Sequence, residues 1–152
     1  MSPSDPDIRF YRLPRNIDRK PLERFQGSLY NHVARGGQFA CLVTTDAELR
    51  RLNRIYRRKD QPTDVLSFPA SPAPGSGNRY LGDVAISWQR ARKQARSFGH
   101  STEVEIQVLM LHGVLHLMGL DHETDRGRMS RAETRWRRTF GLPAGLIERV
   151  TT

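Results

Sequence analysis

One segment of the chain is apolar around most of a helical circumference, and it limits the possible folds more than any other feature. Between Val104 and Met118, apolar residues fall on nearly every side of a predicted helix. A helix of this kind is stable in water only when other elements cover it on all sides. The sequence therefore predicts a central, buried helix on which the rest of the chain packs.

Two histidines interrupt this helix on one face. His112 and His116 are four residues apart, which places their side chains one turn apart. Gly119 follows where helices commonly end in a left-handed residue, and we expect this turn to bring His122 back toward the same face. Three imidazoles with a fourth position open to water are typical of a catalytic zinc site. We therefore predict that His112, His116 and His122 bind one zinc ion.

The alternative is that His112 and His116 are polar interruptions of a core helix that bind no metal. The further spacing of Gly119 and His122 favours the metal site, because four residues in this order rarely arise by accident. The ligand set prefers ions that bind nitrogen, of which zinc is the first choice, and nickel or cobalt would also suit it.

The same stretch is similar to the zinc-protease signature His-Glu-x-x-His-x-x-Gly-x-x-His, with one difference. Gly113 stands where that signature carries the glutamate that acts as general base. Glycine cannot accept a proton. Peptidase chemistry is therefore disfavoured, unless Asp121 or Glu123 takes over the role of the missing carboxylate.

Length and composition predict a single globular domain over residues 1–152, with one sizeable core. The longest mostly apolar run, Val108 to Leu120, is too short to cross a bilayer, so we expect no membrane association. The first residues have neither the basic nor the apolar region of a signal peptide. Cys41 is the only cysteine, which excludes an internal disulfide, and we expect it in the core of a cytoplasmic protein.

The formal net charge of +9 predicts a polyanionic partner such as RNA. Most of the basic residues are arginine, however, and coding sequences rich in G and C produce the same excess. Charge alone therefore indicates the class of partner without establishing it.

The spacing of the apolar residues and the positions of the turn residues predict four strands and five helices. Capping boxes, in which a threonine and a glutamate satisfy helix-start amides, begin two of the helices at Thr45–Glu48 and Thr102–Glu105. The expected strands are 7–13, 39–43, one within 61–69, and 80–87; the expected helices are 21–35, 46–56, 88–98, one from 102, and 125–140.

The second predicted helix ends in a cluster of basic residues that includes Arg57, Arg58 and Lys59. Such a cluster is usually a solvated face. The segment that follows is a turn into a strand, so this helix end is also positioned to reach a sheet edge, where an arginine can bind a phosphate through two hydrogen bonds.

Three separate motifs, in order along about Leu42 to Met129, resemble the YbeY family of bacterial ribosomal RNA maturation factors. They are Leu52-Asn53-x-x-Tyr56-Arg57-x-Lys59-Asp60-x-Pro62-Thr63-Asp64-Val65-Leu66-Ser67-Phe68-Pro69, then Leu81-Gly82-Asp83, then His112-Gly113-x-Leu115-His116-Leu117-x-Gly119-x-Asp121-His122.

This resemblance implies an α+β fold built on a small mixed sheet, here of four strands with about five helices. It implies a zinc-dependent endoribonuclease that is directed at single strands and acts in 3′-end maturation of 16S ribosomal RNA and in ribosome quality control. The implied partners are ribosomal RNA, the small ribosomal subunit and its ribosomal or assembly proteins.

The family's metal ligands fall on His112, His116 and His122, and its functionally important arginine falls on Arg57. We expect Arg57 and His112 to be the catalytic residues. Position 58, often glycine in the family, is Arg58 here, which leaves open which of the two arginines faces the substrate.

Two other functions fit parts of the same sequence. A non-enzymatic ribosome-assembly or RNA-binding factor would use the metal structurally, and its RNA binding would survive metal removal. A metallopeptidase would cleave unstructured polypeptide, and Gly113 argues against it.

Overall fold

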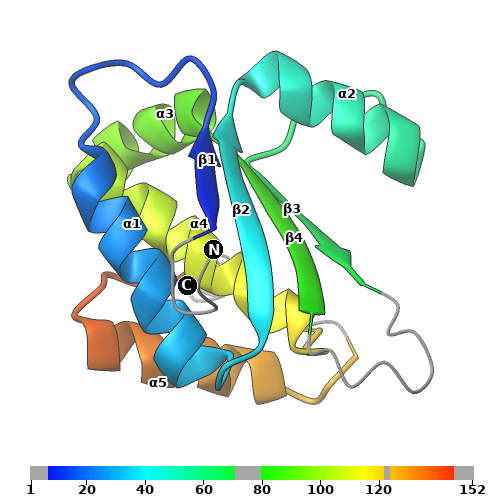
Figure 1. The fold of residues 1–152 in the computed structure, drawn as a ribbon, viewed down its shortest axis with the longest axis vertical. Coiled ribbons are helices and arrows are strands. Elements are labelled where there is room, and N and C mark those ends of the chain that lie inside the picture. Colours follow the sequence, from blue (N-terminus) through cyan, green and yellow to red (C-terminus); the bar gives the residue numbers. More distant parts are fainter. Residues whose placement is uncertain (1–6, 71–79, 122–123, 146–152) are drawn as a thin grey trace.

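The computed structural model describes residues 7–70, 80–121 and 124–145 (Figure 1). Its elements in chain order are β1 (Ile8–Phe10), α1 (Arg19–Ser28), the π-helical turn η1 (Leu29–Val33), β2 (Gln38–Thr44), α2 (Asp46–Arg57), β3 (Val65–Pro69), β4 (Tyr80–Ser87), α3 (Trp88–Phe98), α4 (Thr102–Leu117) and α5 (Arg128–Phe140). The predicted α+β class is confirmed, and each predicted strand and helix is present. The first strand is shorter than expected, because the backbone turns left-handed at Arg12, where φ is 54°.

The four strands form one mixed sheet in the order β1-β2-β4-β3. β1 pairs with β2 and β2 with β4 in parallel, whereas β3 pairs antiparallel with β4. β1 and β3 are therefore the edge strands.

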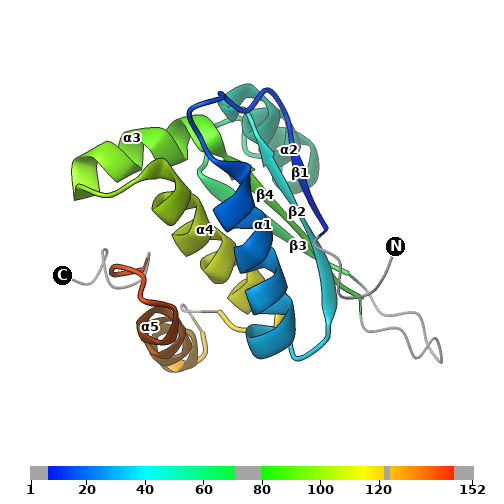
Figure 2. The same cartoon turned by 60° about the vertical axis from the view of Figure 1, so that its left-hand side comes forward.

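The sheet has helices on both faces, but they cover the two faces unequally. α1 and α4 pack on one face, with α5 on the far side of α4, and α2 lies alone across one end of the other face (Figure 2). A small apolar cluster joins α2 to that face, with Leu49 on the helix packed against Leu66 and Ala85 on the strands. Among the described residues, α2 is the one helix that covers this second face, and it covers only part of it.

The central helix predicted from the sequence is α4. It contacts β3 and β4 on one side and α1, α3 and α5 on the others, and nearly all of its side chains from Glu105 to Leu117 are buried. None of the helices within the described residues is long and apolar enough to cross a membrane.

Gly113 lets α4 approach the sheet closely. A Cβ atom at this position would lie 2.6 Å from Cγ1 of Val84, and the Ser67 hydroxyl donates to the Gly113 carbonyl at 3.0 Å. Any side chain at position 113 would therefore point at the sheet. The close approach explains the glycine at the one position where the chain departs from the zinc-protease signature.

The start of α4 differs from the predicted capping box by one residue. Ser101, rather than Thr102, is the N-cap, and its hydroxyl accepts from the Val104 amide at 3.1 Å. With Ser101 as the N-cap, the third helical residue is Val104 rather than Glu105, which is fully buried and lies 2.6 Å from the His100 ring. The other predicted box begins α2 as expected, since Thr45 accepts from the Glu48 amide.

We expect Gly113→Ala to lower the free energy of unfolding by about 1–3 kcal/mol, because the added methyl overlaps a branched side chain on a packed strand. Gly27→Ala is the matched control. Gly27 is also helical but has open space at its Cβ, so alanine there should be neutral or stabilise by up to about 1 kcal/mol. Urea unfolding of both variants measures the difference, and equal stabilities would contradict the proposed close packing.

Candidate functional site

The last two turns of α4 carry two histidines whose rings lie against each other. The His112 and His116 rings meet edge to face, with centroids 4.8 Å apart, as the four-residue spacing predicts. His112 is 8 % exposed and His116 is half-buried, so the pair lies where the buried helix reaches the surface.

A buried glutamate from α5 contacts this pair. Oε2 of Glu133 lies 2.7 Å from Nδ1 of His112, and Glu133 is only 1 % exposed. Glu133 is not among the site residues that the sequence motifs predict. A signal was present, because Glu133 is the one carboxylate on the apolar side of α5, between Met129 and Trp136.

The chain turns sharply after the two histidines, as predicted. Gly119 has a φ of 90°, in the left-handed region that favours glycine. Farther on, Oδ2 of Asp125 accepts from the amides of Asp121 and Met129 at 3.1 and 2.9 Å, which ties the loop to the start of α5. The predicted third ligand, His122, and Glu123 lie outside the described residues, so the three-histidine site remains a prediction.

The described part of the site fits a divalent ion that prefers nitrogen ligands. Two neighbouring imidazoles on a rigid helix, one of them hydrogen-bonded through Nδ1 to a carboxylate, are a common arrangement for ring nitrogens that bind zinc. Within residues 7–70, 80–121 and 124–145, no set of three histidine, cysteine or acidic side chains converges on one point. A complete site therefore needs a ligand from beyond these ranges.

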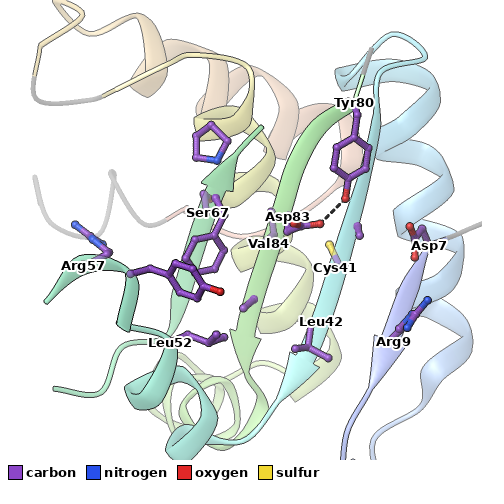
Figure 3. Close-up of a pocket in the computed structure, with 15 residues that line it drawn as sticks. Asp7, Arg9, Cys41, Leu42, Leu52, Arg57, Ser67, Tyr80, Asp83 and Val84 are labelled. Atoms are coloured by element: carbon purple, nitrogen blue, oxygen red, sulfur yellow. Dashed lines mark hydrogen bonds between the residues drawn. The ribbon is translucent and has the colours of Figure 1, made fainter. Parts of the chain in front are cut away.

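An open cavity of about 990 Å³ lies on the face of the sheet that α2 covers in part (Figure 3). We call it the sheet-face cavity. Its lining includes Arg9 on β1, Leu42 on β2, Asp83 on β4, and both Tyr56 and Arg57 at the end of α2. The cavity thus combines cationic, aromatic and apolar groups with two carboxylates, Asp7 and Asp83.

The structure distinguishes the two adjacent arginines at the end of α2. Arg57 lines the sheet-face cavity, whereas Arg58 is the C-cap of α2, in the left-handed conformation with φ 58°. Next to Arg57, the Tyr56 ring is 66 % exposed and meets Phe68 on β3 edge to face, with centroids 5.3 Å apart. The predicted delivery of a basic helix end to a sheet edge is confirmed, because β3 is an edge strand.

Neither His112 nor His116 is among the described residues that line the sheet-face cavity. α4 contacts β3 through the Ser67–Gly113 hydrogen bond, and α2 contacts it from the opposite face through Tyr56 and Phe68. The edge strand β3 therefore separates the helix that carries the histidines from the helix that carries Arg57.

Two titratable groups border the sheet-face cavity without offering a free nucleophile. Cys41 is buried, and burial, with the Asp7 and Asp83 carboxylates nearby, raises the pKa of its thiol far above the usual range. Burial and a hydrogen bond to Asp83 also raise the pKa of the Tyr80 hydroxyl. Both groups stay protonated at neutral pH, so thiolate or phenolate chemistry has no support here.

Comparison with known proteins gives a consistent family match. The family model described as endoribonuclease YbeY matches residues 17–141. A protein named endoribonuclease YbeY from Solibacter usitatus is 58 % identical over 149 residues, which are 98 % of this chain and 97 % of that protein. One of the same name from Koribacter versatilis is 51 % identical over 115 residues, 76 % of this chain and 72 % of that one.

The fold has a match among solved structures. A solution structure of a Thermotoga maritima protein is similar with a TM-score of 0.56 and 25 % sequence identity. The similarity covers 85 % of each chain.

We expect Cys41 in the native protein to be inert toward thiol reagents, because a buried thiol with a raised pKa contains almost no thiolate. Reaction with a chromogenic disulfide reagent at about pH 8, where a free thiol of ordinary pKa begins to ionise, measures this. The protein should react only after unfolding in guanidinium. Rapid reaction of the folded protein would contradict the placement of Cys41 in the core.

Proposed function

Because this chain belongs to the endoribonuclease YbeY family, we propose that it is a metal-dependent endoribonuclease directed at single-stranded RNA. The proposed substrate is 16S ribosomal RNA, cut during maturation of its 3′ end on the small ribosomal subunit in the cytoplasm, with a further part in ribosome quality control. These finer assignments rest on the family resemblance of the sequence motifs.

The observation that carries the metal dependence is the pair of neighbouring imidazoles at the end of α4. We propose His112, His116 and His122 as the ligands of one zinc ion. The ring contact between the first two and the carboxylate beside His112 support this assignment. In such a site, a zinc ion acts as a Lewis acid toward a phosphoryl oxygen or lowers the pKa of water.

Arg57 and His112 are the proposed catalytic residues. During phosphodiester cleavage, negative charge builds on the phosphate oxygens, and a guanidinium that reaches them stabilises that charge. The planar guanidinium of Arg57 can form two hydrogen bonds to a phosphate. His112 lies on a buried helix and its ring contacts the Glu133 carboxylate, so the ring is held in one orientation.

The sheet-face cavity has groups that suit a single RNA strand. Tyr56 offers an exposed ring on which a base can stack, and Arg9 and Arg57 offer positive charge to phosphates. The net charge of +9 adds a long-range attraction to RNA. A paired duplex buries the faces of its bases, so these contacts favour unpaired RNA.

The peptidase alternative lacks a general base at position 113 and depends on Asp121 or Glu123 to replace it. Even if a glutamate replaced this glycine, its side chain would start toward Val84 and Ser67 on the sheet. The non-enzymatic alternative is decided by the experiments below, because it predicts RNA binding without cleavage by the purified protein.

We expect His116→Ala to remove both the bound metal and the cleavage of single-stranded RNA, because the variant lacks one of the proposed ligands. Elemental analysis of the purified protein and a ribonuclease assay measure the two effects. His32→Ala is the matched control, since His32 is an exposed histidine on η1 and should affect neither.

If the His116 variant kept its metal, the proposed ligand set would be wrong. If wild type bound metal and RNA but cleaved nothing, the assembly-factor alternative would hold. The ends of the cleaved RNA identify the attacking group, because a cyclic phosphate would show attack by the 2′-hydroxyl of the RNA.

We expect Arg57→Ala to keep the metal and to lower the cleavage rate by about 10²-fold or more, since one stabilising contact to the transition state is lost. Arg58→Ala is the matched control. It removes the same charge one residue away, from the side chain that is not part of the cavity lining. Single-turnover cleavage with elemental analysis measures both variants, and equal losses of rate would show that net charge, rather than the position of Arg57, is responsible.

A further inference from the structure

We infer that Glu133 is a positioning residue that holds the His112 imidazole with its Nδ1 hydrogen toward α5 and its Nε2 lone pair toward the metal site. This inference rests on the proposed metal site and extends it to a residue outside the histidine motif. The two groups are 21 residues apart in sequence, and their contact joins α4 to α5.

The contact is short, buried and confined. Oε2 of Glu133 lies 2.7 Å from Nδ1 of His112, and the two side chains are 1 % and 10 % exposed. The chain that follows α5 closes over the glutamate, since a Cβ atom at Gly145 would lie 2.1 Å from its Oε1. Glu133 therefore has little room to rotate away from the ring.

The chemistry of the contact selects one form of the ring. A neutral imidazole carries one hydrogen, on either Nδ1 or Nε2, and only the other nitrogen has a lone pair for a metal. A carboxylate oxygen accepts a hydrogen bond, so the close contact favours the hydrogen on Nδ1. The lone pair of Nε2 is then available, and the ring cannot flip without losing its partner.

Stability alone is a poor explanation for this glutamate. A buried charged pair often stabilises a protein no more than apolar residues of the same volume would, because its desolvation offsets its attraction. The other residues on this side of α5 are apolar: Met129 is buried, and Trp136 and Phe140 pack on the core. An apolar residue would therefore also suit position 133. A carboxylate at position 133 is instead suited to orienting the His112 ring.

α4 carries a second buried pair that serves as a control. Oε1 of Glu105 lies 2.6 Å from Nε2 of His100, and Glu105 is fully buried. This pair lies at the start of α4, whereas His112 and His116 lie near its end. Removing either glutamate disturbs a buried histidine contact, but only Glu133 touches a proposed ligand.

The test compares Glu133→Ala and Glu133→Gln with Glu105→Ala. In metal-free protein at about pH 8, above the usual pKa of imidazole, nitrogen NMR of the histidine rings reports which nitrogen carries the hydrogen. We expect the Nδ1–H form for His112 in wild type, retention of this form in Glu133→Gln, whose side-chain oxygen can still accept, and a mixture in Glu133→Ala. Glu105→Ala should leave the His112 signal unchanged.

The second readout is the zinc affinity, measured by competition with a chromogenic chelator. Glu133→Ala should weaken zinc binding by about 10- to 100-fold, with a smaller loss in Glu133→Gln and none in Glu105→Ala. Urea unfolding of the metal-free variants shows whether the substitutions at Glu133 and Glu105 lower the free energy of unfolding to a similar extent.

The outcomes separate this inference from the proposed function. If His112 carried its hydrogen on Nε2 in wild type, or if Glu133→Ala kept both the ring form and the zinc affinity, the positioning role would be wrong. If wild-type protein bound no zinc, the proposed metal site would fail, and the ring form in wild type and Glu133→Ala would still decide whether Glu133 sets the tautomer.

Discussion

The close contact between α4 and the sheet is the interaction on which the rest of the structure depends. At Gly113 the helix lies so near Val84 that an added methyl group would overlap it, and Ser67 bonds to the helix backbone at the same point. Through this contact the apolar side chains of α4 pack on β3 and β4, while α1, α3 and α5 cover the other sides of α4. Because α4 is buried along nearly its whole length, its C-terminal half is a rigid support for His112 and His116.

The edge strand β3 links the two parts of the proposed site. On one face it receives α4 with the histidines, and on the other it receives the end of α2 with Tyr56 and Arg57. A molecule that contacted both Arg57 and the two histidines would therefore have to pass this edge of the sheet.

Local signals predicted much of this arrangement. The period of the apolar residues identified α4 as the buried helix, the histidine spacing placed two rings together, and Gly119 turned the backbone left-handed as expected. The failure at the start of α4 is also local. Ser101 and Thr102 are adjacent and both suitable caps, and in the structure the Ser101 hydroxyl accepts from the Val104 amide while Glu105 contacts His100.

The sequence by itself determined which segment is buried, that His112 and His116 share one helix face, and which helices and strands form, because these features depend on periodicity and on contacts within about one helical turn. Only the tertiary structure decided that Glu133 meets His112, that the strands are ordered β1-β2-β4-β3, and that Arg57 rather than Arg58 lines the cavity. The physical reason is that these contacts join residues far apart in the chain. Their partners are selected by how whole helices pack against the sheet, which no local pattern of residues records.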